Sequence, residues 1–240
     1  MDKAYGAGYG ELYRQHWWWR AREAFLLRNL RRLELVGSPP AILDVGCGDG
    51  LFFPRLSELG KVWGVEPDTE LVSPDGPWAD RIHIGPFDAS YTPGRRFSLI
   101  LMLDVLEHIA DAEAALARAV SLLEQQGTLL ITVPAFRALW TRHDELNQHV
   151  TRYDSRSFRH LAARAGMNIR SMRYFFHWLF PVKLAVRGLE RLNHRVPRPP
   201  RVPPRWVNRS LFGVTRVEQA VTRNLPLPFG SSLLVIGGGA

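Results

Sequence analysis

The stretch I-L-D-V-G-C-G-D-G, residues 42–50, decides the fold of this chain. It begins with a short apolar run that contains Asp44 and is typical of a buried strand. Gly46, Gly48 and Gly50 follow at alternate positions, and a helical pattern starts directly after them. Glycines at a strand-to-helix turn let the backbone approach a ligand closely, because no Cβ stands in the way. The stretch therefore predicts an α/β fold that binds a nucleotide-like ligand at this turn.

Strand and helix patterns alternate outward from this stretch. Further strands are expected at 61–65, 81–84, 97–103, 128–133, 168–176 and 232–236, and helices at 51–59, 111–124 and 154–165. Residues 97–103 are nearly all apolar, as in a central parallel strand that is buried on both faces. An N-terminal helix is expected over 11–36, where Gly37 and two prolines end it. This order predicts a mostly parallel sheet with helices on both faces.

Three carboxylates follow the predicted strands. Asp44 lies two residues before the first glycine, Glu66 ends the second strand in V-W-G-V-E-P, and Asp88 follows the third in G-P-F-D-A-S. A carboxylate at the end of the second strand can accept both hydroxyls of a ribose, and one after the third can accept from an adenine amino group. Asp49 stands where the pyrophosphate of a dinucleotide would approach in a G-x-G-x-x-G loop. A negative side chain is unfavourable beside phosphate but acceptable beside a sulfonium, which disfavours a nicotinamide dinucleotide.

The motifs D-V-G-C-G-D-G, V-E-P, F-D and L-D-V-L-E-H-I (residues 103–109) together resemble class I S-adenosylmethionine-dependent methyltransferases. The resemblance covers roughly residues 40–170, and L-D-V-L-E-H-I resembles the small-molecule and quinone-type branch. The stretches 16–22 and 140–166 are similar to a bacterial subgroup. The resemblance implies a Rossmann-like, seven-stranded, mostly parallel sheet of order 3-2-1-4-5-7-6 with an antiparallel last strand. It also implies S-adenosyl-L-methionine as the cofactor.

The resemblance implies roles for single residues. Glu66 would hold the ribose hydroxyls, Phe87 and Asp88 the adenine, and Leu103 would flank the amino-acid end of the cofactor. Arg20 or Arg22 would pair with the cofactor carboxylate, a charge-assisted contact suited to arginine. The expected cofactor-binding residues are thus Arg20, Asp44, Gly46, Gly48, Asp49, Glu66, Phe87, Asp88 and Leu103.

Three histidines are candidate general bases, because histidine accepts protons near neutral pH. His143 and His149 lie in a loop after the fifth strand that also holds Asp144 and Tyr153, and His108 starts the helix after the fourth strand. The alternative is that each of them only shapes its turn or loop. The spacing of these groups matches no tight ligand pattern, so we expect no metal.

An aromatic lid is a second hypothesis for the substrate side of the site. Trp18 and Trp19, with Tyr153, are candidates, because an aromatic face stabilises a cationic sulfonium or amine. The alternative is that the tryptophans pack the N-terminal helix against the core. Three consecutive tryptophans, residues 17–19, cannot all face inward on one helix.

The domain organisation follows from the pattern and from the charge. We expect a helical lid at 1–38, a cofactor-binding core at 39–176 plus 231–240, and an inserted, basic, proline-rich subdomain at 177–230. Residues 183–223 hold one lysine and nine arginines against two glutamates, and the rest of the chain carries equal numbers of basic and acidic residues. The net charge of +8 therefore lies in this insert. Arginines beside Trp178, Leu179, Phe180 and Trp206 would suit an anionic membrane or a phosphate-bearing lipid; a solvated cap or an oligomer contact are the alternatives.

Composition limits the class of function. The chain of 240 residues is 46% hydrophobic, and its only cysteine is Cys47. Neither a signal-peptide pattern nor an apolar run of membrane-spanning length is expected, which indicates a cytoplasmic protein with a peripheral membrane contact as an option.

The expected function is S-adenosylmethionine-dependent O- or N-methylation of a small-molecule or lipid-linked acceptor. Two alternatives keep the fold: a cyclase that releases methylthioadenosine, and a non-catalytic module that binds a membrane or a partner. Nucleic acid is disfavoured as a substrate, because the Asn/Asp-Pro-Pro-Tyr type of motif of base methylases is missing. The acceptor and the oligomeric state stay open.

Overall fold

The computed structural model describes residues 3–192 and 200–239. Part of the predicted proline-rich connector, residues 193–199, lies outside the described residues. The chain divides into two compact units. The first comprises Met1–Leu33, Pro134–Arg152 and Arg173–Leu233, and the second comprises Glu34–Val133, Tyr153–Met172 and Leu234–Ala240.

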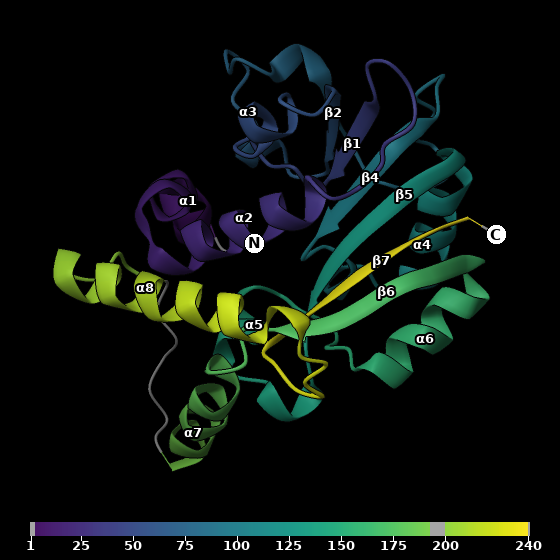
Figure 1. Ribbon diagram of the computed structural model, residues 1–240. Coiled ribbons are helices and arrows are strands. Elements are labelled where there is room, and N and C mark those ends of the chain that lie inside the picture. The colour runs from purple at the N-terminus through teal and green to yellow at the C-terminus, as the bar shows by residue number, and fades with distance from the viewer. Residues whose placement is uncertain (1–2, 193–199, 240) are drawn as a thin grey trace. The chain divides into compact units, whose positions relative to one another are not determined.

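A seven-stranded sheet has the order β3-β2-β1-β4-β5-β7-β6 (Figure 1), which confirms the predicted fold class. β1 pairs in parallel with β2 and with β4, and the pairs β2–β3 and β4–β5 are parallel too. The strands are β1 (Ala41–Val45), β2 (Lys61–Glu66), β3 (Ile82–Ile84), β4 (Phe97–Leu103), β5 (Leu123–Pro134), β6 (Met167–Phe175) and β7 (Ser232–Gly239).

The apolar strand β4 lies at the centre of this sheet, between β1 and β5. All its residues from Phe97 to Met102 are buried, as its composition predicts. Each buried leucine or isoleucine there contributes about 1.5–3 kcal/mol relative to an exposed one. The strand order changes direction beside β1, because β2 and β4 flank it on either side. In open α/β sheets the ligand-binding crevice lies at such a point, outside the carboxyl ends of the strands.

Helices cover both faces of the sheet (Figure 1). On one face lies α3 (Phe53–Leu56), and on the other α4 (Ala112–Ser121) and α6 (Ser155–Arg164). Asp111 caps α4, its carboxylate accepting from the Ala114 N–H at 2.9 Å. Asp154 and Ser157 form a reciprocal capping box on α6, which fixes where that helix begins. Short 3-10 turns are η1 (Thr69–Leu71), η2 (Ala79–Arg81) and η3 (Leu106–His108).

Two predicted boundaries in this unit are wrong. The predicted helix 51–59 shrinks to the four residues of α3. The predicted helix 111–124 ends at Ser121, and β5 begins at Leu123 instead of residue 128. Leu123 pairs with Phe97 across an irregularity in the strand pairing, which contains Gln126 at a φ of 66°. A bulge of this kind leaves little trace in hydrophobic periodicity.

The other unit is helical. It contains α1 (Lys3–Gln15), α2 (Trp17–Leu30), η4 (Arg137–Leu139), α5 (Arg142–Leu146), α7 (Leu179–Leu192), α8 (Arg205–Val221) and η5 (Thr222–Asn224). Helix α2 packs against both α1 and α8. No helix among the described residues is long and apolar enough to cross a membrane.

The expected single N-terminal helix is in fact two helices that meet at His16. The backbone of His16 is extended, and its Nδ1 accepts a hydrogen bond from the Trp18 N–H at 3.2 Å. Burial lowers the pKa of His16 to about 4, so the ring is neutral and able to accept. Helix α2 also ends at Leu30, before the predicted stop at Gly37. The predicted domain limits themselves stay a prediction.

Candidate functional site

The carboxyl ends of β1, β2 and β4 meet at one edge of the sheet and carry three of the predicted residues. Asp44 is the last but one residue of β1, Glu66 is the last of β2, and Leu103 is the last of β4. Asp44 and Glu66 are buried, and Leu103 is half-buried. The parallel pairing of β1 with both neighbours therefore brings these residues to the same edge of the sheet.

The glycine loop after β1 has two positions with different constraints. Gly46 and Gly48 have φ values of 71° and 54°, in the left-handed region that favours glycine. A Cβ on Gly46 would lie 2.7 Å from Cγ2 of Val105, the residue before η3. The missing side chain of Gly46 therefore lets Val105 pack closely against the glycine loop. A Cβ on Gly48 would meet no atom within 4 Å. The backbone of Gly48 thus faces open space at the crevice, where a ligand can approach it.

Glu66 joins this loop to the end of β2. Its Oε2 accepts from the Gly48 N–H at 2.9 Å, and its Oε1 accepts from the Asp68 N–H at 3.0 Å. Burial raises the pKa of Glu66, although these two backbone donors oppose the shift. Each carboxylate oxygen has a second lone pair, so the group can accept two further hydrogen bonds.

The residues predicted for an adenine group follow β3. Phe87 is buried, and its ring centroid lies 5.8 Å from that of Tyr91. Asp88 is exposed, and its Oδ1 accepts from Ser90 through both the hydroxyl at 2.6 Å and the N–H at 2.8 Å. These bonds lower the pKa of Asp88, so it is ionised at neutral pH. Its Oδ2 would be the oxygen to meet an amino group.

Two aspartates at this edge have structural partners that the sequence did not reveal. Oδ1 of Asp49 accepts from the Ser73 N–H at 2.9 Å and so ties the glycine loop to the segment after β2. Asp104, which follows β4, has a φ of 59°, and its Oδ1 accepts from the Thr132 hydroxyl at 3.0 Å. Asp104 was missed as a site residue; its only sequence signal is its place inside L-D-V-L-E-H-I.

Cys47 lies in the loop between Gly46 and Gly48. Burial, together with the negative charges of Asp44 and Glu66, raises the pKa of its thiol. A thiol that stays protonated is a poor nucleophile.

In the helical unit, α2 carries the predicted arginine and the tryptophans. The Arg20 side chain is exposed, and its guanidinium lies 4.7 Å from the ring centroid of Phe212 on α8. Trp19 is buried against Leu12, whereas Trp18 is half-buried. The alternating environments agree with the rule that consecutive tryptophans cannot all face inward, and the lid role stays a prediction for both.

The loop that includes α5 is organised around Asp144. This carboxylate is fully buried and accepts from Nδ1 of His149 at 2.8 Å. Arg152 holds it in a bidentate pair, with Nε 2.7 Å from Oδ1 and Nη2 2.9 Å from Oδ2, and Thr141 donates its N–H at 2.8 Å. Burial alone would raise the pKa of Asp144, but the bonds from His149 and Arg152 outweigh it and hold that pKa well below its usual range.

The two histidines of this loop differ in their hydrogen-bond partners and hence in their suitability as a general base. The Asp144 carboxylate fixes the tautomer of His149 that carries its proton on Nδ1, which leaves the Nε2 lone pair as the basic one. His143 is exposed on α5, and its Nε2 lies 3.0 Å from the amide nitrogen of Asn147. His149 has the carboxylate partner that a general base commonly uses. Arg152 was missed; its signal is the R-Y pair that follows the loop.

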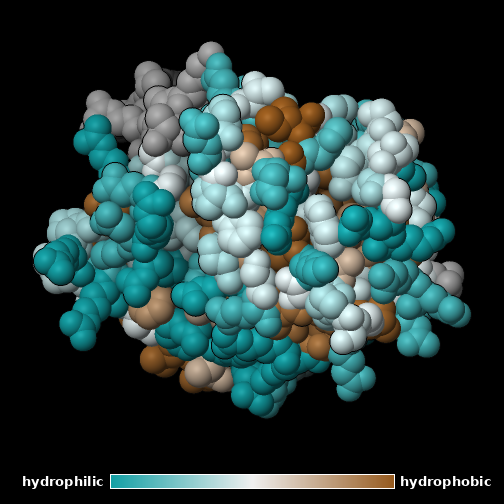
Figure 2. Space-filling view, turned by 90° about the horizontal axis from the view of Figure 1, so that it is seen from above, coloured by the Kyte–Doolittle hydropathy of each residue, from teal (hydrophilic) through white to brown (hydrophobic). Residues whose placement is uncertain are grey.

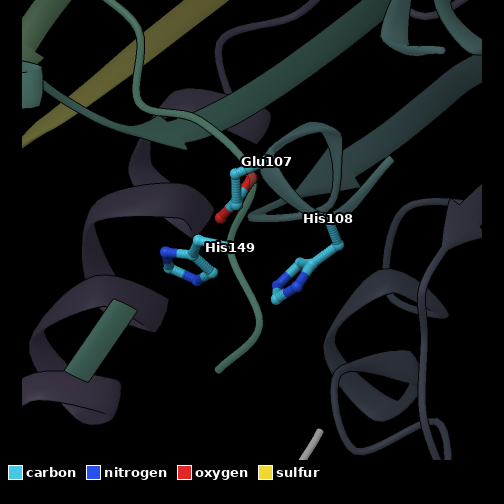
Figure 3. A group of neighbouring side chains, drawn as sticks. All are labelled: Glu107, His108 and His149. Carbon is cyan, nitrogen blue, oxygen red and sulfur yellow. The ribbon is translucent and has the colours of Figure 1, made fainter. Parts of the chain in front are cut away.

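The remaining predicted residues belong to or contact η3. Glu107 and His108 come from this turn, and His149 comes from the segment after α5 (Figure 3). Glu107 is fully buried and His108 is exposed. The Tyr153 hydroxyl donates to the Leu106 carbonyl at 3.4 Å, and burial, followed by the charge of Glu107, raises its pKa to about 12.

Comparisons with known proteins agree on one family. The family model described as "Methyltransferase domain" matches residues 18–172. A curated relative is the ubiquinone biosynthesis O-methyltransferase of Bradyrhizobium diazoefficiens, which is 33% identical over 112 residues, or 44% of each chain. The chain thus matches less than half the length of this relative.

Solved structures show the same fold at low sequence identity. One is a chain of the complex between the Haloferax volcanii Trm112 methyltransferase activator and a methyltransferase, with a TM-score of 0.61 and 18% identity over 98% of this chain and 94% of that one. Another is a TehB-like S-adenosylmethionine-dependent methyltransferase from Corynebacterium glutamicum, with a TM-score of 0.57 and 18% identity over the full length of both chains.

Proposed function

The chain belongs to the methyltransferase domain family, and from this premise we propose that it transfers a methyl group from S-adenosylmethionine to a small-molecule or lipid-linked acceptor. The observation that carries the proposal is the open space at Gly48, bordered by the ordered carboxylate of Glu66. S-adenosylmethionine supplies an activated methyl group on a sulfonium. The protein then needs to hold the cofactor, align the acceptor and remove a proton where the acceptor requires it.

The residues at the sheet edge fit this cofactor in their chemistry. Two lone pairs of Glu66 remain for the two hydroxyls of a ribose, and the close approach to Gly48 suits the adjoining backbone. Asp88 supplies an acceptor for an amino group beside the apolar ring of Phe87. Acidic groups along the crevice favour a cationic ligand and disfavour a pyrophosphate. Asp44, Asp49 and Leu103 remain proposed contacts of the methionine part.

The class of acceptor is inferred from the names of the relatives. The matched relatives are named ubiquinone biosynthesis O-methyltransferases, a name that refers to a quinone pathway and to methylation of an oxygen atom. This supports a small or lipid-linked acceptor for this chain, with oxygen ahead of nitrogen. Because the similarity covers less than half of each chain, the acceptor has to be found by experiment.

His149 is the proposed general base for an acceptor that must lose a proton. Its support is the buried Asp144 partner, which is in turn fixed by Arg152. His143 and His108, both exposed, rank behind it. Removing a general base commonly costs about 10²- to 10⁴-fold in rate. Once an acceptor is known, we expect His149→Ala to lose activity in this range and His143→Ala to stay within a few-fold of the parent. Equal turnover in all three proteins would remove the base from the proposal.

The direct test of the function is the identity of the nucleoside product. The purified protein would be incubated with methyl-labelled S-adenosylmethionine and a panel of catechols, prenylated hydroquinones and amines, followed by mass spectrometry. S-adenosylhomocysteine together with a labelled acceptor is the expected result. Methylthioadenosine in its place would support a non-methylating reaction, and a folded protein that yields neither product would favour a non-catalytic module.

A further inference from the structure

The inward side of helix α8 carries buried polar side chains beside the half-buried Leu211 and Phe212. Asn208 accepts from the Trp17 N–H at 2.7 Å and donates to the Gln15 carbonyl at 2.8 Å. About three turns further along the same side of the helix, Gln219 donates to the Ala21 carbonyl at 3.2 Å. Both side chains lie on the side of α8 that packs against α2.

The outward side of α8 is apolar. Trp206, Val214, Val217 and Val221 have exposed fractions of 75%, 53%, 65% and 67%. The last three follow one another at intervals of three and four residues, so they form a continuous stripe, which Ser210 and Gly213 extend toward Trp206. An amphipathic helix on a water-exposed surface ordinarily exposes polar side chains on its outward side instead.

On the face drawn in Figure 2, hydrophilic residues predominate and hydrophobic residues occur in small, separate groups. Helix α7 adds a second set of exposed aliphatic side chains, Val182, Val186 and Leu189, at helical spacing. Apolar surface that is concentrated along helices of one segment is typical of an interaction site.

The charges around the stripe identify the kind of partner. Residues 183–223 contain ten basic and two acidic side chains, and both acids are engaged within the protein. Glu190 accepts from the Arg142 N–H at 3.1 Å, and Glu218 accepts from the backbone N–H groups of His177 and Trp178. Arg205, Arg209 and Arg223, by contrast, are exposed beside the stripe.

We propose that the outward side of α8 docks on an anionic phospholipid surface. Trp206 and the valines would enter the interfacial region while the arginines bind lipid phosphates, as in helices that lie in the membrane plane. A second copy of this chain is disfavoured as the occupant, because it would bring an equally cationic segment against the first. Of the four apolar residues that first suggested a membrane contact, only Trp206 belongs to this outward side of α8. Leu179 is buried, Phe180 is half-buried against Phe136, and Trp178 donates its Nε1–H to Thr215 at 3.2 Å.

Vesicle sedimentation of the purified full-length chain, without cofactor, tests this surface independently of methyl transfer. We expect binding to vesicles of phosphatidylglycerol and phosphatidylcholine, little binding to pure phosphatidylcholine, and loss of binding in high salt, where the Debye length falls to about 3 Å. Val217→Glu should weaken binding about tenfold. Arg209→Gln should weaken it about fivefold, as expected for one basic residue at the surface.

Matched variants separate the stripe from general effects. Val150→Glu makes the same change at an aliphatic residue that is 57% exposed in another segment, and Arg159→Gln removes an exposed arginine from α6. Both should bind vesicles within about twofold of the parent, a change of a few tenths of a kcal/mol. Circular dichroism of all four variants would show that they are folded.

Two results would overturn the proposal. The first is that the parent fails to bind the anionic vesicles, or that Val150→Glu weakens binding as much as Val217→Glu. The second is a parent dimer in sedimentation equilibrium that Val217→Glu dissociates while vesicle binding is unchanged, which would assign the stripe to self-association.

Discussion

Substituting Gly48 by alanine tests whether the open space at this residue is the cofactor site. The new methyl group would meet no protein atom within 4 Å, so it would project into the space that we assign to the cofactor. Filling a site that a ligand packs against costs about 1–3 kcal/mol, which corresponds to about a 5- to 150-fold loss of affinity. Calorimetric titration with S-adenosylhomocysteine would measure this loss.

Backbone strain at this position needs its own control, and Gly94 provides it. Gly94 has a φ of 65°, close to the 54° of Gly48, and a Cβ there would also meet nothing within 4 Å. Gly94 precedes β4, whereas Gly48 follows β1, so the two lie at opposite ends of paired parallel strands. Alanine at a positive φ costs about 1–2 kcal/mol, and each kcal/mol lowers the melting temperature of a chain of this size by about 2–4 °C.

The two variants should therefore lose similar stability and differ in binding. Gly94→Ala should bind S-adenosylhomocysteine like the parent, and Gly48→Ala should bind it at least several-fold more weakly. Unchanged affinity in a folded Gly48→Ala protein would refute the assignment. An equal loss in Gly94→Ala would show that strain, and not the occupied space, is responsible.

Three further predictions concern buried ionisable groups. Because burial raises the pKa of Glu66, affinity for S-adenosylhomocysteine should fall as the pH is lowered through that raised pKa and the carboxylate takes up a proton. Glu66→Gln should bind weakly without this dependence, and pH-independent binding by the parent would contradict the role of the carboxylate. The low pKa of Asp144 contributes stability that is present above about pH 4 and is lost as the pH falls through that low value. Asp144→Asn should lower the free energy of unfolding, measured in urea at neutral pH, by about 3–5 kcal/mol. The control, Asp88→Asn at an exposed position, should lower it by about 0.5 kcal/mol. A loss for Asp144→Asn as small as that of the control would mean that the pair with Arg152 does not stabilise the fold. The raised pKa of the Cys47 thiol predicts slow alkylation by iodoacetamide in the folded protein and fast alkylation in urea, so equal rates would be inconsistent with its burial.

The parts of the fold that could be predicted are those written in short, local patterns. The apolar run of β4, the glycines after β1 and the acid at the end of β2 each lie within a few residues and place the crevice. The N-cap at Asp111 follows the same logic, because the capping carboxylate and the N–H that donates to it are three residues apart. The strand order, by contrast, was predicted only from the resemblance of the motifs to those of a known family.

The features that were missed depend on residues distant in sequence or on single backbone angles. The break between α1 and α2 depends on the backbone of His16, within a run that otherwise favours helix. The bond from Ser73 to Asp49 spans 24 residues, and no periodicity indicates it. The inward placement of Asn208 and Gln219 on α8 becomes visible only when their partners, the backbone carbonyls of Gln15 and Ala21, are known.

The most direct test of the central claim is calorimetric titration of the purified parent chain with S-adenosylmethionine and with S-adenosylhomocysteine. We predict saturable binding of both ligands, with one site per chain. A protein that is folded by circular dichroism and binds neither ligand would contradict the assignment and leave this chain a binding module on a methyltransferase fold.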